Sequence, residues 1–113
     1  MHELTIALSI ISAVTQKLAP EQTVTAVTID IGALTGVVPQ ALQFVWTSAT
    51  QDTPLSGSKL HLNYHPVSGP CPTCKKDVTP DDPYIPLCPI CDSRLTSLIN
   101  GRQLDIQSFT IDK

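Results

Sequence analysis

The chain has 113 residues, of which 42% are hydrophobic and 15% charged, a balance typical of one small folded protein and not of a disordered or fibrous one. Its formal net charge is −3, and no cluster of Lys or Arg is present. Nucleic-acid modules normally carry a basic stripe, so we expect no nucleic-acid partner.

The first apolar stretch, residues 4–14 (LTIALSIISAV), is shorter than the roughly 20 apolar residues that a membrane span needs. No positive charge precedes it, as one would in a secretion signal, and Glu3 stands in that place. We therefore expect a cytoplasmic protein without a membrane span. In a reducing compartment, cysteines act as metal ligands more often than they form disulfides.

Apolar residues recur twice at helical spacing. The first set lies on one face of a predicted helix that Pro20 ends: Leu4, Ala7, Leu8, Ile11, Val14 and Leu18. The second set belongs to a helix that begins at Pro39, where a missing N–H costs nothing, and runs to about Ala49: Val38, Leu42, Val45 and Ala49.

A period of two predicts strands over residues 23–31, 59–65 and 103–111. The first two enclose the second helix, so they should be parallel with a right-handed crossover. In the third, Leu104 and Ile106 share one face, whereas Phe109 and Ile111 have the opposite parity. Either both faces are partly covered or a bulge intervenes. The fold class expected is mixed α/β, with two helices on a three-stranded mixed sheet.

The stretch from Pro66 to Gly101 carries seven of the ten prolines and all four cysteines. Proline at this density prevents helix formation and weakens strand pairing, so the stretch cannot join the sheet. It is interpreted as a zinc ribbon inserted in a long hairpin. The expected domains are residues 67–99 for the ribbon and residues 1–66 with 100–113 for a discontinuous α/β domain.

The cysteines form two CxxC pairs separated by thirteen residues: Cys71, Cys74, Cys88 and Cys91. Two such pairs supply the four tetrahedral sulfurs that structural zinc prefers, and they leave no position open for catalysis. Two disulfides, a redox CxxC and an iron electron carrier are the alternatives. Lys75 and Asp92, each directly after a pair, stand where a left-handed residue is often needed and glycine would be easiest.

The start of the chain, Met1, His2 and Glu3, offers an amine, amide nitrogens and an imidazole that can close small chelate rings around one cation. Planar nitrogen coordination of this kind suits Ni(II) or Cu(II) and is poor for zinc. The alternative is a surface histidine, with Glu3 favouring the positive end of the helix. His61 and His65 share a strand face, as a second ligand pair or as solvated side chains.

Four segments resemble, in order and spacing, the HypA family of hydrogenase-maturation nickel chaperones: MHELTIALSI, IGALTGVVPQAL (31–42), the two CxxC pairs and LDIQSFTI (104–111). The resemblance implies a nickel-binding α/β domain with a zinc ribbon, and Ni(II) at Met1, His2 and Glu3. It also implies transfer of nickel, with the accessory GTPase HypB, to the large subunit precursor of [NiFe]-hydrogenase, or in some organisms to urease.

The chain departs from the family pattern at the two residues after the CxxC pairs, where glycines are common, in its additional prolines, and at Ala33, where a charged residue is frequent. The expected function is a nickel metallochaperone and not an enzyme, with transferred Ni(II) and structural Zn(II). The alternative is a zinc-ribbon adaptor for protein or nucleic acid, without nickel.

Overall fold

The computed structural model describes the backbone of residues 2–112 and the side chains of residues 3–112. The chain forms two compact units. The first, called here the sheet unit, comprises Met1–Asp30, Val37–Asn63 and Asp105–Lys113. The second, called the ribbon unit, comprises Ile31–Gly36 and Tyr64–Leu104.

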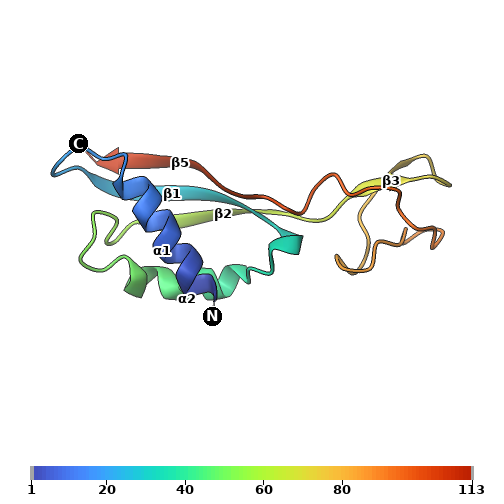
Figure 1. Cartoon of the computed structure of the whole chain (residues 1–113), viewed down its shortest axis with the longest axis horizontal. Helices are drawn as coiled ribbons and strands as arrows, with labels where there is room; N and C mark the ends of the chain where they lie inside the picture. The colour runs from blue at the N-terminus through green and yellow to red at the C-terminus, as the bar shows by residue number, and fades with distance from the viewer. Residues whose placement is uncertain (1, 113) are drawn as a thin grey trace. The chain divides into compact units, whose positions relative to one another are not determined.

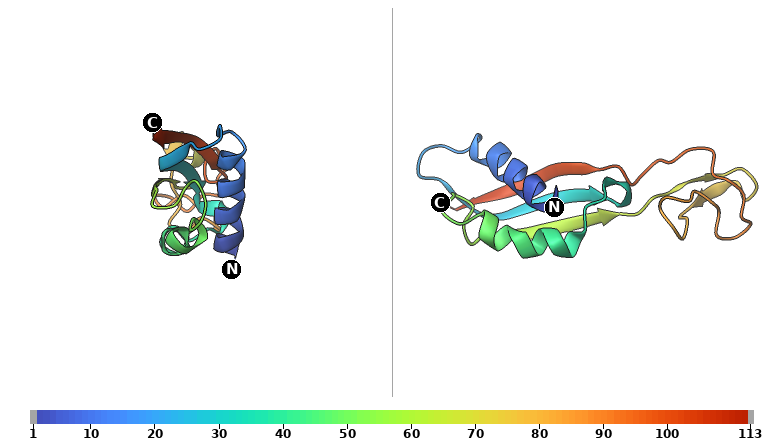
Figure 2. Two further views of the ribbon diagram at one scale, coloured as in Figure 1. Left: turned by 90° about the vertical axis from the view of Figure 1, so that its left-hand side faces the viewer. Right: turned by 60° about the horizontal axis from the view of Figure 1, so that its bottom comes forward.

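Two helices and a three-stranded sheet form the larger part of the chain: α1 (His2–Thr15), β1 (Thr23–Gly32), α2 (Pro39–Ala49), β2 (Lys59–His65) and β5 (Leu104–Asp112). The strand order is β2-β1-β5. Strands β1 and β2 run in the same direction and β5 runs in the opposite one, so the sheet is mixed (Figure 1). The helices pack against each other on one face of the sheet (Figure 2). The predicted fold class is confirmed.

The buried face of α1 differs from the predicted one. Ala7, Ile11 and Val14 are buried as expected, but Leu4 and Leu8 are 48% and 51% exposed. Ile10, which lay outside the predicted face, is buried. Residues 4–16 contain no charged side chain, so the sequence holds two overlapping apolar stripes with nothing to distinguish them. Packing against α2 and the sheet selects one stripe.

Helix α2 has the predicted bounds but buries Trp46 together with Leu42, while Val38 is half exposed. The indole Nε1 of Trp46 donates a hydrogen bond to Ser58 Oγ at 3.1 Å. Burial of a tryptophan requires such a partner for its N–H group. Trp46 lies at helical spacing from Leu42, but the predicted face took the neighbouring Val45, which is only half-buried.

Strand β5 runs without interruption, one residue later than predicted at each end. Phe109 and Ile111 are half-buried, whereas Leu104 and Ile106 are exposed. Neither face of this strand is therefore a fully buried core face. None of the helices among residues 2–112 combines the length and the apolarity that crossing a membrane requires.

The ribbon unit contains the short helix η1 (Ala33–Thr35) and the antiparallel pair β3 (Gly69–Cys71) and β4 (Lys76–Val78). The buried core around its cysteines consists of four residues: Cys71, Val78, Cys88 and Leu95. A core of this size stabilises little structure by hydrophobic burial alone, which agrees with the scarcity of apolar residues between the cysteine pairs.

Backbone hydrogen bonds near two glycines join residues 32–34 to residues 101–103 within the ribbon unit. The N–H of Gly32 donates to the carbonyl of Gln103 at 2.7 Å, and the N–H of Leu34 donates to the carbonyl of Gly101 at 2.6 Å. A Cβ placed on Gly32 would collide with the carbonyl group of Gly101 and lie 2.6 Å from the Arg102 nitrogen. These are backbone atoms, which cannot relieve the clash by a rotamer change as a side chain could.

We therefore expect Gly32→Ala to lower the free energy of unfolding of the zinc-loaded protein by at least about 2 kcal/mol, since the backbone must shift to admit the methyl group. Gly57→Ala is the control, because a Cβ on Gly57 meets nothing within 4 Å and only the positive φ of 77° opposes it. That strain costs about 1 kcal/mol. Urea unfolding measures both, and equal losses would contradict the predicted close approach at Gly32.

Candidate metal centre

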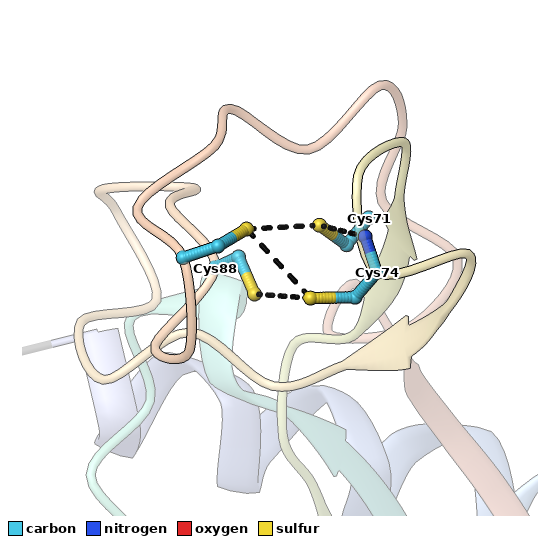
Figure 3. A group of neighbouring side chains, drawn as sticks. Cys71, Cys74 and Cys88 are labelled. Carbon is cyan, nitrogen blue, oxygen red and sulfur yellow. Dashed lines mark hydrogen bonds between the residues drawn. The ribbon is translucent and has the colours of Figure 1, made fainter.

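The ribbon unit brings all four cysteine sulfurs together, as Figure 3 shows for the labelled Cys71, Cys74 and Cys88. All four Sγ atoms lie within 4.8 Å of one another. The Sγ of Cys91 lies 3.5 Å from that of Cys71 and 3.7 Å from that of Cys74, and the Cys74 and Cys88 sulfurs are 3.9 Å apart. A tetrahedron with Zn–S bonds of about 2.3 Å has edges of about 3.8 Å, so the spacing fits a tetrahedral cation.

The two CxxC pairs adopt equivalent turns that aim backbone N–H groups at sulfur. The N–H of Cys74 donates to the Sγ of Cys71 at 3.3 Å, and the N–H of Ile90 donates to the Sγ of Cys88 at 3.4 Å. Each turn therefore directs one backbone N–H group at the sulfur of its first cysteine.

Each turn closes at the residue after its second cysteine. The N–H of Lys75 donates to the Cys71 carbonyl and that of Asp92 to the Cys88 carbonyl, both at 2.8 Å. Lys75 has a φ of 58° and Asp92 a φ of 62°. The expectation of left-handed backbone at these two positions is confirmed. A lysine is strained there, since this conformation costs about 1–2 kcal/mol for most side chains.

The thiols are electrostatically unequal without a cation. The hydrogen bond with Ser93 Oγ, 3.2 Å away, lowers the pKa of Cys91 to about 6. The hydrogen bond between Cys74 and Cys91 raises the pKa of Cys74 to about 12, because the Cys74 proton is shared with its neighbour. Four thiolates at these distances would repel one another. A bound dication would offset that repulsion and favour the thiolate form of its ligands.

The donor set excludes disulfides and fits a tetrahedral metal ion. The four cysteines are free thiols, and the measured separations exceed the S–S bond length of about 2.05 Å that a disulfide needs. A closed set of four sulfurs suits Zn(II) as a structural ion. Iron accepts the same tetrahedron, so the geometry alone does not separate the two metals.

Met1 and the side chain of His2 lie outside the described residues. The backbone of His2 begins α1, and Glu3 follows in its first turn. The Oε2 atom of Glu3 accepts the N–H of Val38 at 3.3 Å. This hydrogen bond holds the pKa of the Glu3 carboxyl below its usual value. Val38 is the N-cap of α2, so Glu3 ties the starts of the two helices together.

The two remaining histidines do not form a second centre with other ligands. His61 is exposed and His65 half-buried on β2. Among the side chains that the structure describes, the four cysteines are the only group of three or more potential metal ligands within reach of one ion.

Sequence reasoning missed two contacts of the candidate sites. Ser93, which modulates the Cys91 thiol, lies two residues after it, and a hydroxyl this close to a CxxC pair is a signal that could have been used. The backbone of Val38, which contacts Glu3, gives no such signal, because any residue type except proline offers an N–H group.

Comparison with known proteins places these observations in a family. The family model described as "Hydrogenase/urease nickel incorporation, metallochaperone, hypA" matches residues 1–111. The hydrogenase maturation factor HypA of Chloroflexus aurantiacus is 38% identical over 108 residues, which cover 94% of this chain and 95% of the relative. That of Geobacter metallireducens is 34% identical over 112 residues, which cover 99% and 100%.

The solution structure of the Ni metallochaperone HypA from Helicobacter pylori has the same fold, with a TM-score of 0.61 and 17% sequence identity. The match covers 98% of this chain and 97% of that one. With a family match over residues 1–111 and curated relatives above 30% identity along nearly the whole chain, this chain belongs to the HypA family of nickel-incorporation metallochaperones in hydrogenase maturation.

Proposed function

We propose that this chain binds Ni(II) at Met1, His2 and Glu3 and delivers it, together with the accessory GTPase HypB, to the large subunit precursor of [NiFe]-hydrogenase. Membership of a nickel-incorporation family supports the cargo. The observation that carries the location is the hydrogen bond from Val38 to the Glu3 carboxylate, which anchors the first turn of α1 where a chain end would ordinarily fray.

The beginning of α1 provides suitable nitrogen donors. Helix α1 starts at His2, and the N–H groups in the first turn of a helix have no acceptor within it. The amide nitrogens of His2 and Glu3 belong to this first turn. Together with the amine of Met1 and the imidazole of His2, they offer a set of nitrogen donors, a ligand type that suits Ni(II).

In the same proposal, Cys71, Cys74, Cys88 and Cys91 bind one structural Zn(II) ion. The tetrahedral spacing of the sulfurs supports this assignment. A four-sulfur shell leaves no position for water or nickel, so zinc contributes folding energy and no chemistry. We assign zinc binding to residues 67–99, nickel binding to residues 1–66 with 100–113, and the site of action to the cytoplasm, where free thiols persist.

His2→Ala removes the imidazole and should weaken Ni(II) binding by at least about a hundredfold, a greater loss than that for a residue which only supports a ligand. A single glycine added before Met1 should weaken it similarly, because the chelate ring of the amine is displaced. Titration calorimetry on zinc-loaded protein with a native amino terminus should give one nickel per chain. Unchanged nickel binding in both variants, with zinc content intact, would favour the adaptor function.

Glu3 is proposed to act through its contact with Val38 and not as a nickel ligand through its carboxylate. Glu3→Ala should weaken nickel binding by about tenfold, since the first turn loses its anchor. Glu3→Gln keeps an amide oxygen that can accept the Val38 N–H and should retain most of the affinity. If Glu3→Gln were as damaging as His2→Ala, the carboxylate itself would be the ligand.

Cys91→Ser should lower zinc affinity by at least about a hundredfold and expose the ribbon amides to hydrogen exchange, because metal binding supplies most of their folding energy. Amides of α1 and α2 should stay protected. Ser93→Ala is the matched control, since it removes a hydroxyl near the cluster and leaves four sulfurs. Zinc per chain by elemental analysis and exchange by mass spectrometry measure the effect, and a protected ribbon without zinc would refute the structural role.

A further inference from the structure

The ribbon unit exposes an unusual concentration of large apolar side chains between its two cysteine pairs and within the second. Tyr84, Ile85, Leu87 and Ile90 are between 39% and 63% exposed, all within seven residues of sequence. Single exposed apolar residues are ordinary, but several in one short segment of a small protein mark a surface that another molecule covers. We call these four residues the ribbon patch.

A hollow lies beside the ribbon patch. It has a volume of about 150 Å³, and Ile85, Leu87 and Pro89 form its apolar walls. Asp81, Asp82 and Asp92 stand at the same hollow, all of them exposed. This volume accommodates one or two side chains and is too small for an ordinary cofactor, whose pocket measures about 300–1,000 Å³.

The backbone around the ribbon patch is held in place before any partner arrives. The Asp82 carboxylate accepts the N–H of Tyr84 at 2.9 Å, and the Pro86 carbonyl accepts the N–H of Leu95 at 2.9 Å. Pro83 and Pro89 fix φ at two further positions. A surface already ordered in this way loses little conformational entropy on binding.

The negative charge around the ribbon patch favours a positively charged partner. Residues 77–92 contain four aspartates and no Lys or Arg, and the nearest basic residues in sequence are Lys76 and Arg94. An apolar hollow bordered by carboxylates complements a segment that alternates apolar and basic side chains. The same charge repels phosphate backbones.

We propose that the ribbon patch and its three aspartates dock a cationic, amphipathic peptide segment of a partner protein, with an apolar side chain in the hollow and Lys or Arg against the carboxylates. This surface lies wholly in the ribbon unit. It requires no nickel, so the proposal is independent of the nickel site and can fail or succeed without it.

The test uses the full zinc-loaded chain and a fluorescein-labelled peptide of alternating leucine and lysine as probe, followed by fluorescence anisotropy. The unaltered chain should bind this peptide at least about tenfold more tightly than peptides of alternating leucine and glutamate or serine and lysine, because both apolar contact and positive charge are needed. Added salt should weaken the binding, since the aspartates are exposed.

Two double variants address the two halves of the surface. Ile85→Ser with Ile90→Ser removes apolar area. Asp81→Asn with Asp82→Asn removes charge, while the side-chain amide oxygen at position 82 can still accept the Tyr84 N–H. Each should weaken binding of the leucine–lysine peptide by about tenfold. Zinc content verifies that each variant keeps its fold, and if the isoleucine variant loses zinc, the aspartate variant alone decides.

The matched controls lie on the sheet unit. Phe44→Ser removes the most exposed apolar side chain, at 84%, and Asp105→Asn with Asp112→Asn removes two exposed charges. Both should leave peptide binding unchanged. Equal losses in controls and ribbon variants would overturn the proposal. So would a concentration-dependent dimer of the free chain that Ile85→Ser abolishes, because the surface would then pair two copies of this chain.

Discussion

The crowding of four cysteine sulfurs within 4.8 Å of one another is the constraint on which the ribbon depends. Beyond the cysteines, the buried core around the cluster contains Val78 and Leu95, so hydrophobic burial alone contributes little to the order of this part of the ribbon. The sulfurs cannot all be thiolates without a cation, because like charges at this distance repel. Hydrogen bonds also make the thiols unequal: the bond with Ser93 lowers the pKa of Cys91 to about 6, and the bond with Cys91 raises the pKa of Cys74 to about 12. A bound dication offsets the repulsion between the four ligands, so metal binding and folding of the ribbon are coupled.

The sheet unit holds the first turn of α1 in place. Helix α1 begins at His2, and the N–H groups of its first turn have no acceptor within the helix. Glu3 supplies two compensations: its charge favours the positive end of the helix, and its carboxylate accepts the N–H of Val38 at the start of α2. The packing of α1 on α2 then transmits this tie along both helices. An ordered first turn is what a ligand set built from backbone nitrogens requires.

The sequence predicted the elements well and their buried faces less well, for physical reasons that particular residues show. Proline at position 39 marks the start of α2, and the period-two alternation of Leu60, Leu62 and Tyr64 marks β2, so both elements match their predicted bounds. Leu4 was wrongly placed on the buried face and Trp46 was missed, because the buried face of a helix depends on which other elements pack against it. The cysteine cluster followed from spacing alone. The contacts of Ser93 and of the Val38 backbone did not, since they arise only when the chain has folded.

Under the proposed assignment, one small chain keeps two metals apart by ligand type and by closure of the coordination shell. Soft sulfur in a closed tetrahedron retains zinc, because no ligand position is open to an incoming donor. Nitrogen donors from the first residues suit Ni(II). Affinity order alone would not separate these ions, since both bind nitrogen and sulfur strongly. Under this assignment zinc stays in its closed sulfur shell, whereas transfer of a metal needs a shell that opens from one side.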